Sequence, residues 1–161
     1  TILANTRTIG GVNFNGASNI DNFSISSGTS SFSTITASGD ITAYSSDKRL
    51  KKDIVIIENP LEKLQKLSGF TYHWNKEKCT NAGFEPNDEK QVGMFAQDVQ
   101  EVIPEAVKIA PFDRDENGES KSGDNYLTVQ YEKLIPLLIE SNKALLKRVE
   151  ELEELVKNKI N

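Results

Sequence analysis

Residues 131–160 read YEKLIPLLIESNKALLKRVEELEELVKNKI, and their apolar side chains recur every three or four positions. That spacing predicts one long helix with an apolar stripe, and the stripe follows the seven-residue repeat of a coiled coil. The first repeat position holds Ile135, Asn142, Val149 and Val156, and the fourth holds Tyr131, Leu138, Leu145, Leu152 and Lys159. We therefore expect a seam along this helix at which copies of the chain associate.

Three further details of the helix bear on how it packs. Ile139 and Leu146 widen the stripe, which predicts that the first half of the helix also packs on the rest of the domain. Pro136 is tolerated only in a first turn, where amides have no partner inside the helix, so the helix must begin near Glu132. Valine at the first repeat position with leucine at the fourth mildly favours two strands over three, so the seam leaves the number of strands open.

The stretch before this helix alternates short strand and helix signals. Asn59, Pro60 and Glu62 combine an N-cap, a first-turn proline and an early acid, which together predict a helix start, and Gly69 predicts its end. Short runs of apolar or alternating residues predict strands at 53–57, 70–75 and 92–95, a helix at 96–102, and a hairpin of 107–109 with 126–130. The middle of the chain is therefore expected to be a small α+β body.

Residues 1–45 have a different composition. They contain 26 Ser, Thr, Asn or Gly residues and only three charged ones, whereas the other 40 charged residues follow. Short strand signals lie at 23–27 and 32–37, but so few large side chains cannot offset the chain entropy of an isolated monomer. We expect a fibrous β-structure shared between identical subunits, with disorder as the alternative. Because position 1 is Thr, we also expect the chain to be a piece of a longer one.

The residue counts exclude several classes of protein. One Cys and one His cannot build a zinc finger or a disulfide framework. A net charge of −5 gives no basic field for nucleic acid or for an anionic membrane surface. No run approaches the roughly 20 apolar residues that a membrane span needs. We expect no cofactor, no nucleic-acid partner and no membrane partner.

Three other features have a functional and a structural interpretation. Asp113, Asp115, Asn117 and Asp124 partly imitate a calcium loop, but the expected strand that follows favours a solvated acidic hairpin loop without metal. His73, beside Trp74 on an expected strand, is interpreted as half-buried packing because no second His or acid cluster accompanies it. Cys79, in a polar stretch, is interpreted as a free thiol in a loop.

Three blocks of sequence carry a resemblance to a known family. They are Ser46-Asp-Lys-Arg-Leu-Lys-Lys-Asp-Ile54, the segment GMFAQDVQEVIPEAV at 93–107, and the segment YLTVQYEKLIPLLIE at 126–140. In this order they resemble the endosialidase-type intramolecular chaperone, the auto-processing domain that ends many phage tail spikes and fibres. Residues 5–14, NTRTIGGVNF, also resemble phage fibre stem sequence. The central block includes Gln97, Pro104 and Glu105, which we interpret as packing or capping residues.

The resemblance implies a homotrimer whose C-terminal domain helps three stem segments to fold and then cuts itself off. The expected domains are the end of a stem at 1–45 and a chaperone at 46–161, divided into a body at 46–130 and a trimerisation helix at 131–161. The seam of the trimer would be formed by Ile135, Leu138, Asn142, Leu145, Val149, Leu152 and Val156. Its partners would be its own copies and the stem in cis, first in the host cytoplasm and then, for the stem, in the virion tail.

The resemblance also implies a catalytic pair. It maps the cut to the bond between Ser45 and Ser46, with Ser46 as nucleophile and Lys51 as general base. At the reference lysine pKa near 10.4 only about 1 molecule in 2,500 is neutral at pH 7, so burial between subunits, beside other cations, is expected to favour the neutral amine. Asp47 and Arg49 match the motif too, either orienting the pair or only fixing a turn.

Two alternatives compete with this interpretation. The chain could be a trimeric fibre tip that binds a host surface and is never cut. On the residues alone, without the resemblance, Ser46 and Asp47 could also form an ordinary polar turn with Lys51 solvated.

Overall fold

The computed structural model of the chain describes residues 7–9, 12–14, 36, 38, 40–41 and 45–160. Its backbone divides into two compact units, Thr1–Tyr44 and Ser45–Asn161. In the first unit, β1 (Arg7–Ile9) pairs antiparallel with β2 (Val12–Phe14). The strands expected at 23–27 and 32–37 lie outside the described residues, apart from Thr36. The fibrous stem therefore stays a prediction.

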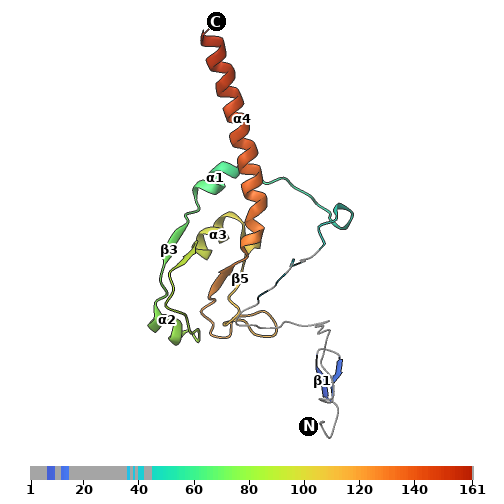
Figure 1. The fold of residues 1–161 in the computed structure, drawn as a ribbon, viewed down its shortest axis with the longest axis vertical. Coiled ribbons are helices and arrows are strands. Elements are labelled where there is room, and N and C mark those ends of the chain that lie inside the picture. The colour runs from blue at the N-terminus through green and yellow to red at the C-terminus, as the bar shows by residue number, and fades with distance from the viewer. Residues whose placement is uncertain are drawn as a thin grey trace. The chain divides into compact units, whose positions relative to one another are not determined.

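The second unit is a small α+β body with a long C-terminal helix, as expected (Figure 1). No helix of the described residues is long and apolar enough to cross a membrane. In chain order its elements are η1 (Lys48–Leu50), α1 (Pro60–Gln65), β3 (Phe70–Tyr72), α2 (Lys76–Asn81), β4 (Gln91–Gly93), α3 (Ala96–Val102), η2 (Pro104–Ala106), β5 (Val107–Ile109), β6 (Leu127–Val129), η3 (Tyr131–Leu134) and α4 (Ile135–Ile160).

The strands of this unit form two separate antiparallel pairs. Phe70 of β3 lies opposite Gly93 of β4, and Val107 of β5 lies opposite Val129 of β6, which confirms the expected hairpin. A chain of ring contacts links the two pairs, with successive centroids 4.3–6.0 Å apart. In order, its members are Phe95, Phe70, Tyr72, Trp74, Phe84, Phe112 and Tyr126. Aromatic contacts thus connect the two strand pairs, which are not joined to each other by hydrogen bonds.

The core lies between α3, η2 and the start of the terminal helix. Val99 and Ala106 are fully buried, and Val107 and Leu134 complete the cluster. The backbone N–H of Gln130 donates to the carbonyl of Ala106 at 2.8 Å, which ties the end of β6 to η2. The body is held by a few small aliphatic side chains, so one copy buries only a modest core.

The terminal helix packs on the body through a different face from the one expected. Leu137 and Ser141 are buried, and the Ser141 hydroxyl donates to the carbonyl of Pro60 in α1 at 3.1 Å. Ile139 and Leu146, which were predicted to make this contact, are 49 % and 60 % exposed. The face that contacts the body instead contains Leu134, Leu137 and Ser141, each of which lies one residue before a position of the predicted stripe. The predicted stripe itself therefore stays uncovered.

The start of the helix agrees with the expectation for Pro136, which falls in the first turn of α4 after the 3₁₀ turn η3. Tyr131, however, belongs to η3 and not to the helical seam. Its hydroxyl accepts a hydrogen bond from the backbone N–H of Met94 at 3.3 Å. A Cβ at Gly93 would lie 2.9 Å from the same hydroxyl oxygen, so this close approach requires glycine.

Two further predictions about the body are wrong. Residues 53–57 form no strand, because no strand of the described residues lies beside them, and Ile54, Val55 and Ile56 are 68 %, 79 % and 67 % exposed. Asn59 does precede α1, but its φ of 49° is left-handed and its side chain makes no capping bond. The helix α2 was missed because its sequence, KEKCTN, has no apolar period, although the Asn75 side chain caps it by accepting from the Lys78 N–H.

Candidate active site

Ser46 and Lys51 lie within hydrogen-bond distance of each other. The Lys51 ammonium donates to the Ser46 hydroxyl oxygen, and the two atoms Nζ and Oγ are 2.8 Å apart. The 3₁₀ turn η1 between them folds the chain back, since the Lys51 N–H donates to the Lys48 carbonyl and the Leu50 N–H to that of Asp47. A hydroxyl that touches an amine can pass its proton to that amine when the amine is neutral.

Asp47 and Arg49 stabilise this turn. The Asp47 carboxylate accepts from the Arg49 backbone N–H at 2.9 Å and caps η1, and the Arg49 guanidinium binds both of its oxygens, the shortest contact being 2.6 Å. The hydrogen bonds from Arg49 lower the pKa of Asp47, and the same pairing raises the pKa of Arg49. Neither side chain bonds to Ser46 or Lys51, so their geometry fits a role in fixing the turn.

The pair is open to solvent in a single copy of the chain. Ser45, Ser46 and Lys51 are all exposed, as are the neighbouring cations Lys48 and Lys52. Water around an exposed lysine stabilises its charged form, which cannot accept a proton. The arrangement therefore has the contact that proton transfer needs, while the burial that would favour a neutral amine is absent from one copy.

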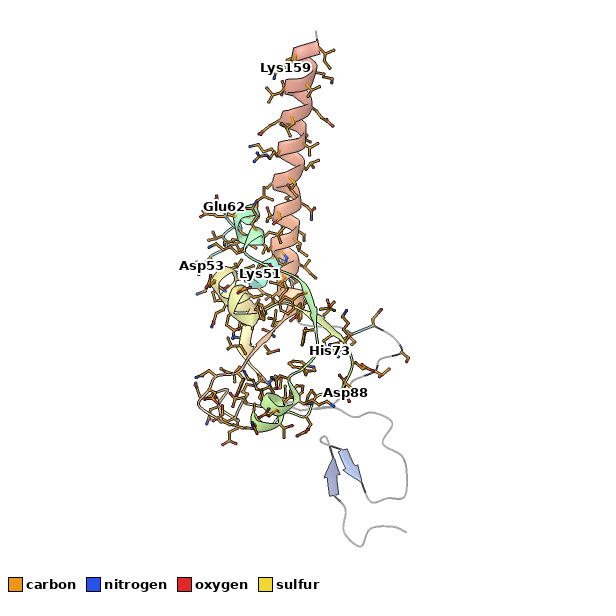
Figure 2. All side chains as sticks on the ribbon, turned by 90° about the vertical axis from the view of Figure 1, so that its left-hand side faces the viewer. Lys51, Asp53, Glu62, His73, Asp88 and Lys159 are labelled. Carbon is orange, nitrogen blue, oxygen red and sulfur yellow. The ribbon has the colours of Figure 1, made fainter. Side chains whose placement is uncertain are left out.

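His73, the single histidine, does not extend this pair. It is exposed and follows the end of β3, so the expected half-buried strand position is wrong. Figure 2 shows His73 lower in the body, apart from Lys51. Cys79 is a free cysteine, as expected, but it lies half-buried in α2 and not in a loop.

The acidic loop between β5 and β6 is organised by its own hydrogen bonds. Asp113 is 3 % exposed, and its carboxylate accepts from the Ser120 hydroxyl at 2.7 Å and from the N–H groups of Ser122 and Tyr126. Asp115 accepts from two N–H groups of the loop in the same way. Within the described residues no three His, Cys, Asp or Glu side chains gather as metal ligands. The loop differs from the expected solvated one, because Asp113 is a buried anchor.

Acid is expected to weaken this anchor. The hydrogen bonds, led by that from Ser120, lower the pKa of Asp113 from 3.8 to about 2. Because the folded-state pKa lies below the unfolded one, the stabilisation is complete above about pH 4 and is lost as the pH falls through 2. Thermal unfolding from pH 7 to pH 2 should show Asp113→Asn melting below the wild type at pH 7, with the difference shrinking towards pH 2. A constant difference across this range would contradict the anchor.

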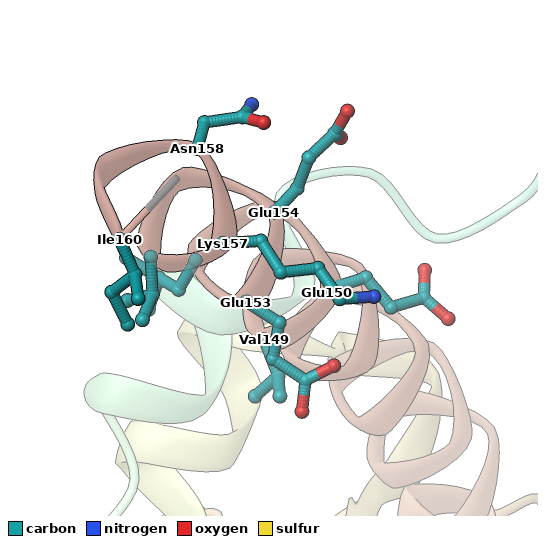
Figure 3. Close-up of a pocket in the computed structure, with 9 residues that line it drawn as sticks. Val149, Glu150, Glu153, Glu154, Lys157, Asn158 and Ile160 are labelled. Carbon is teal, nitrogen blue, oxygen red and sulfur yellow. The ribbon is translucent and has the colours of Figure 1, made fainter.

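The predicted seam of α4 is uncovered along its whole length. Ile135, Leu138, Leu145, Val149, Leu152 and Val156 are each about half exposed. Figure 3 shows the outer part of this helix, where an open hollow is lined by residues of α4 alone, among them Val149, Glu153 and Ile160. Asn142, also exposed, turns its amide back to the Leu138 carbonyl at 2.8 Å. A single copy therefore leaves a continuous apolar stripe in water, which marks an interaction surface.

Comparison with known proteins gives the candidate site a family context. The family model described as Chaperone of endosialidase, Peptidase S74, matches residues 46–108, and so its match begins at Ser46. The long tail fiber protein Gp37 of Enterobacteria phage K3 is 40 % identical over 108 residues, which is 67 % of this chain and 8 % of that protein. The Gp37 proteins of Enterobacteria phage T2 and Salmonella phage S16 are 40 % and 42 % identical over 108 and 66 residues, 67 % and 41 % of this chain and 7 % and 8 % of their own lengths.

This chain thus spans less than a tenth of the length of these relatives. The matched region holds both residues of the hydrogen-bonded pair and the core helix α3. Two of the three blocks from which the resemblance was drawn, at 46–54 and 93–107, lie within the matched region, and the third, at 126–140, lies after it. Residues 46–108 are therefore a domain of the endosialidase chaperone family, Peptidase S74, and the chain is related to the long tail fibre proteins of phages.

Proposed function

We propose that this chain is a homotrimeric intramolecular chaperone of a phage tail fibre that cuts itself between Ser45 and Ser46. The observation that carries the proposal is the 2.8 Å contact of Lys51 Nζ with Ser46 Oγ at the first residue of the family match. Trimerisation would register the stem during assembly in the host cytoplasm. Cleavage would then leave the stem in the virion tail and release the chaperone.

The exposed face of α4 supports association through this helix. Beyond the seam positions, Leu146, Leu155 and Ile160 are also more than half exposed, so the apolar face is wider than a two-stranded coil covers well. This width favours three strands and outweighs the mild preference of valine and leucine for two. In a parallel arrangement Arg148 of one helix would lie beside Glu153 of the next, the usual spacing for an ion pair between strands.

A chaperone is needed because the stem sequence specifies its own register poorly. Residues 1–45 are rich in Ser, Thr, Asn and Gly, and such strands can slip by a residue or more without losing many contacts. Three stems attached to an assembled C-terminal domain meet at an effective concentration in roughly the millimolar range. Once the chaperone is cut off, an unfolded stem cannot easily find its register again, so the fibre is kept folded by a slow unfolding rate.

Cleavage would proceed through an ester. Neutral Lys51 takes the proton of the Ser46 hydroxyl, and the oxygen attacks the carbonyl carbon of Ser45 through a five-membered ring. The Ser45–Ser46 amide bond breaks as its nitrogen takes up a proton, and the acyl group of Ser45 is left on Ser46 Oγ. Water then hydrolyses the ester, which gives a carboxylate on Ser45 and a free amine and hydroxyl on Ser46. No cofactor enters any step.

Assembly would switch this reaction on. In one copy Lys51 is exposed to water, whereas contact with a neighbouring subunit would exclude water and favour the neutral amine. The charges of Lys48 and Lys52 would act in the same direction. The base would therefore form only after the three chains have met.

Light scattering and a denaturing gel of the chain joined to its native upstream stem test the proposal. We expect three chains per particle and a new N-terminus at Ser46. Particles of one chain would refute the trimeric chaperone, and two chains would mean that the valine and leucine preference of the seam decides the assembly. A trimer that stays intact under all conditions would favour the non-cleaving fibre tip that binds a host surface.

Asp47→Ala is expected to slow cleavage by roughly 10–100-fold, because the loosened turn no longer holds Lys51 against Ser46. Asp47 would act as a positioning residue, so the pH at which the rate is half-maximal should stay unchanged. Asp88→Ala is the matched control, since this exposed carboxylate pairs with Lys76 in another part of the body and makes no bond to the turn. Equal rates for the two variants would show that Asp47 does not position the pair.

A further inference from the structure

The segment that joins η1 to α1 exposes an unusual run of apolar residues. Leu50 is 75 % exposed, and Ile54, Val55 and Ile56 are exposed by at least two thirds. No backbone hydrogen bond joins residues 54–57 to any other described residue. We refer to residues 50–57 as the arm, and Figure 1 shows it leaving α1 and standing clear of the body. Uncharged β-branched residues with unpaired backbone groups invite pairing with another chain.

The body carries an apolar groove that the arm of the same chain does not fill. The groove has a volume of about 650 Å³ and lies between β3, the start of α3, and β6. Its apolar lining includes Phe70, Tyr72, Met94, Phe95, Leu127 and Val129, and Phe95 is 58 % exposed. None of residues 50–57 lines it. One copy therefore exposes both the apolar arm and an apolar groove that could bind it.

The two surfaces face different ways around the terminal helix. Figure 1 shows the arm on one side of α4 and β3, which borders the groove, on the other. A contact between two different surfaces of identical chains is heterologous, and it closes into a ring when the rotation between copies is correct. A rotation about an axis parallel to α4 would bring the arm of one copy towards the groove of the next.

The arm is long enough for this contact. The nine residues between Leu50 and Pro60 can span up to about 30 Å, whereas the axes of packed helices lie only about 8–10 Å apart. Lys51 lies within the arm, three residues before Ile54, and Ser46 is bonded to Lys51. When the arm docks on a second copy, Ser46 and Lys51 therefore lie at the interface between the two copies.

We propose that the arm of each copy, through Ile54, Val55 and Ile56, docks into the apolar groove of a second copy of the chain, and that this docking covers Ser46 and Lys51. The inference rests on the proposed trimer, and it names the surface that would bury the pair. Association through α4 would bring the copies together, and docking of the arms would then complete the site.

Cross-linking tests the docking. In the full chain with Cys79→Ser, Val55→Cys is combined with Gln97→Cys, an exposed residue that lines the groove. A short bismaleimide should then give covalent dimers and trimers on a denaturing gel. The control combines Val55→Cys with Thr71→Cys, which is exposed on β3 but does not line the groove, and it should give none. Covalent oligomers from Val55→Cys alone would place the arms against one another and overturn the proposal.

Light scattering of the same variants separates the two ideas. Trimers in which the Val55–Gln97 pair fails to cross-link between chains would overturn the docking and leave the trimer intact, whereas monomers would overturn both.

A second pair of variants tests the coverage of the catalytic pair. Ile54→Asp with Ile56→Asp should slow cleavage at least tenfold in a chain that remains trimeric. Ile41→Asp, at an equally exposed isoleucine outside the arm, should cut normally. Unchanged cleavage in the arm variant would contradict the coverage.

Discussion

Replacing Lys51 by alanine or by arginine is expected to leave the full chain uncut, with cleavage slowed by roughly 10²–10⁴-fold, the usual contribution of a general base. Alanine removes the nitrogen that lies 2.8 Å from Ser46 Oγ. Arginine restores the charge and much of the length, but a guanidinium keeps its proton at any workable pH and cannot accept another. The measurement is the fraction of chain cut over time on denaturing gels.

Lys48→Ala is the matched control for this prediction. Lys48 belongs to the same turn and is also exposed, but its side chain makes no bond to Ser46. The Lys48 variant should therefore still cut, losing only the contribution that its charge makes to the neutral amine of Lys51, and all three variants should remain trimeric. Cleavage that persists in Lys51→Arg would mean that another group, or solvent, takes the proton of Ser46.

Breaking the seam should stop cleavage without touching the pair. Leu145→Glu with Leu152→Glu places two carboxylates in each strand of the proposed trimer. Each leucine is about half exposed in one copy, so the six of them forgo roughly 6–9 kcal/mol of apolar burial on assembly, before the repulsion between the new charges. We expect monomers by light scattering and an intact chain on the gel.

Lys157→Gln with Asn158→Glu is the control for the seam variant. It changes the charge of the helix by the same two units at positions outside the first and fourth places of the repeat. This control should assemble and cut. Cleavage by a proven monomer of the Leu145 and Leu152 variant would refute the idea that assembly activates the base, even if the pair itself is catalytic.

The parts of the fold that were predicted well are those whose signals are local. The helix α3 has the bounds expected from its pattern before Pro104, and the hairpin of β5 and β6 pairs as its alternating residues indicated. The strand predicted at 53–57 is wrong for the opposite reason, because its formation depends on a partner that is not local. Their apolar run fits a strand, but a strand needs a neighbour, and sequence patterns do not show whether one exists within the same chain.

The terminal helix shows a similar limit. Periodicity predicted its existence and its exposed stripe, but the same periodicity assigned the contact with the body to Ile139 and Leu146. The true contact includes Ser141, a small polar residue whose hydroxyl bonds to the Pro60 carbonyl. A serine among apolar positions gives no signal of burial, because its hydroxyl can be buried only where it finds a hydrogen-bond partner, and here that partner is 81 residues away in the sequence.

At the site, spacing alone could not distinguish a reactive pair from a polar turn. The family resemblance singled out Ser46 and Lys51, and the turn held by Asp47 and Arg49 accounts physically for their contact across five residues. The anchor role of Asp113 was missed, since an acidic Gly-containing loop looks solvated until its N–H and hydroxyl donors are seen to converge on one carboxylate.

The most direct test of the central claim is N-terminal sequencing of the C-terminal fragment that the chain releases when it is joined to its native upstream stem. Self-cleavage by Ser46 predicts a fragment that begins at Ser46 in the wild type and no such fragment from Ser46→Ala, with both proteins trimeric. The same fragment from Ser46→Ala would contradict the account, because the attacking oxygen would be absent and the cut would come from another protease acting on the exposed Ser45–Ser46 segment.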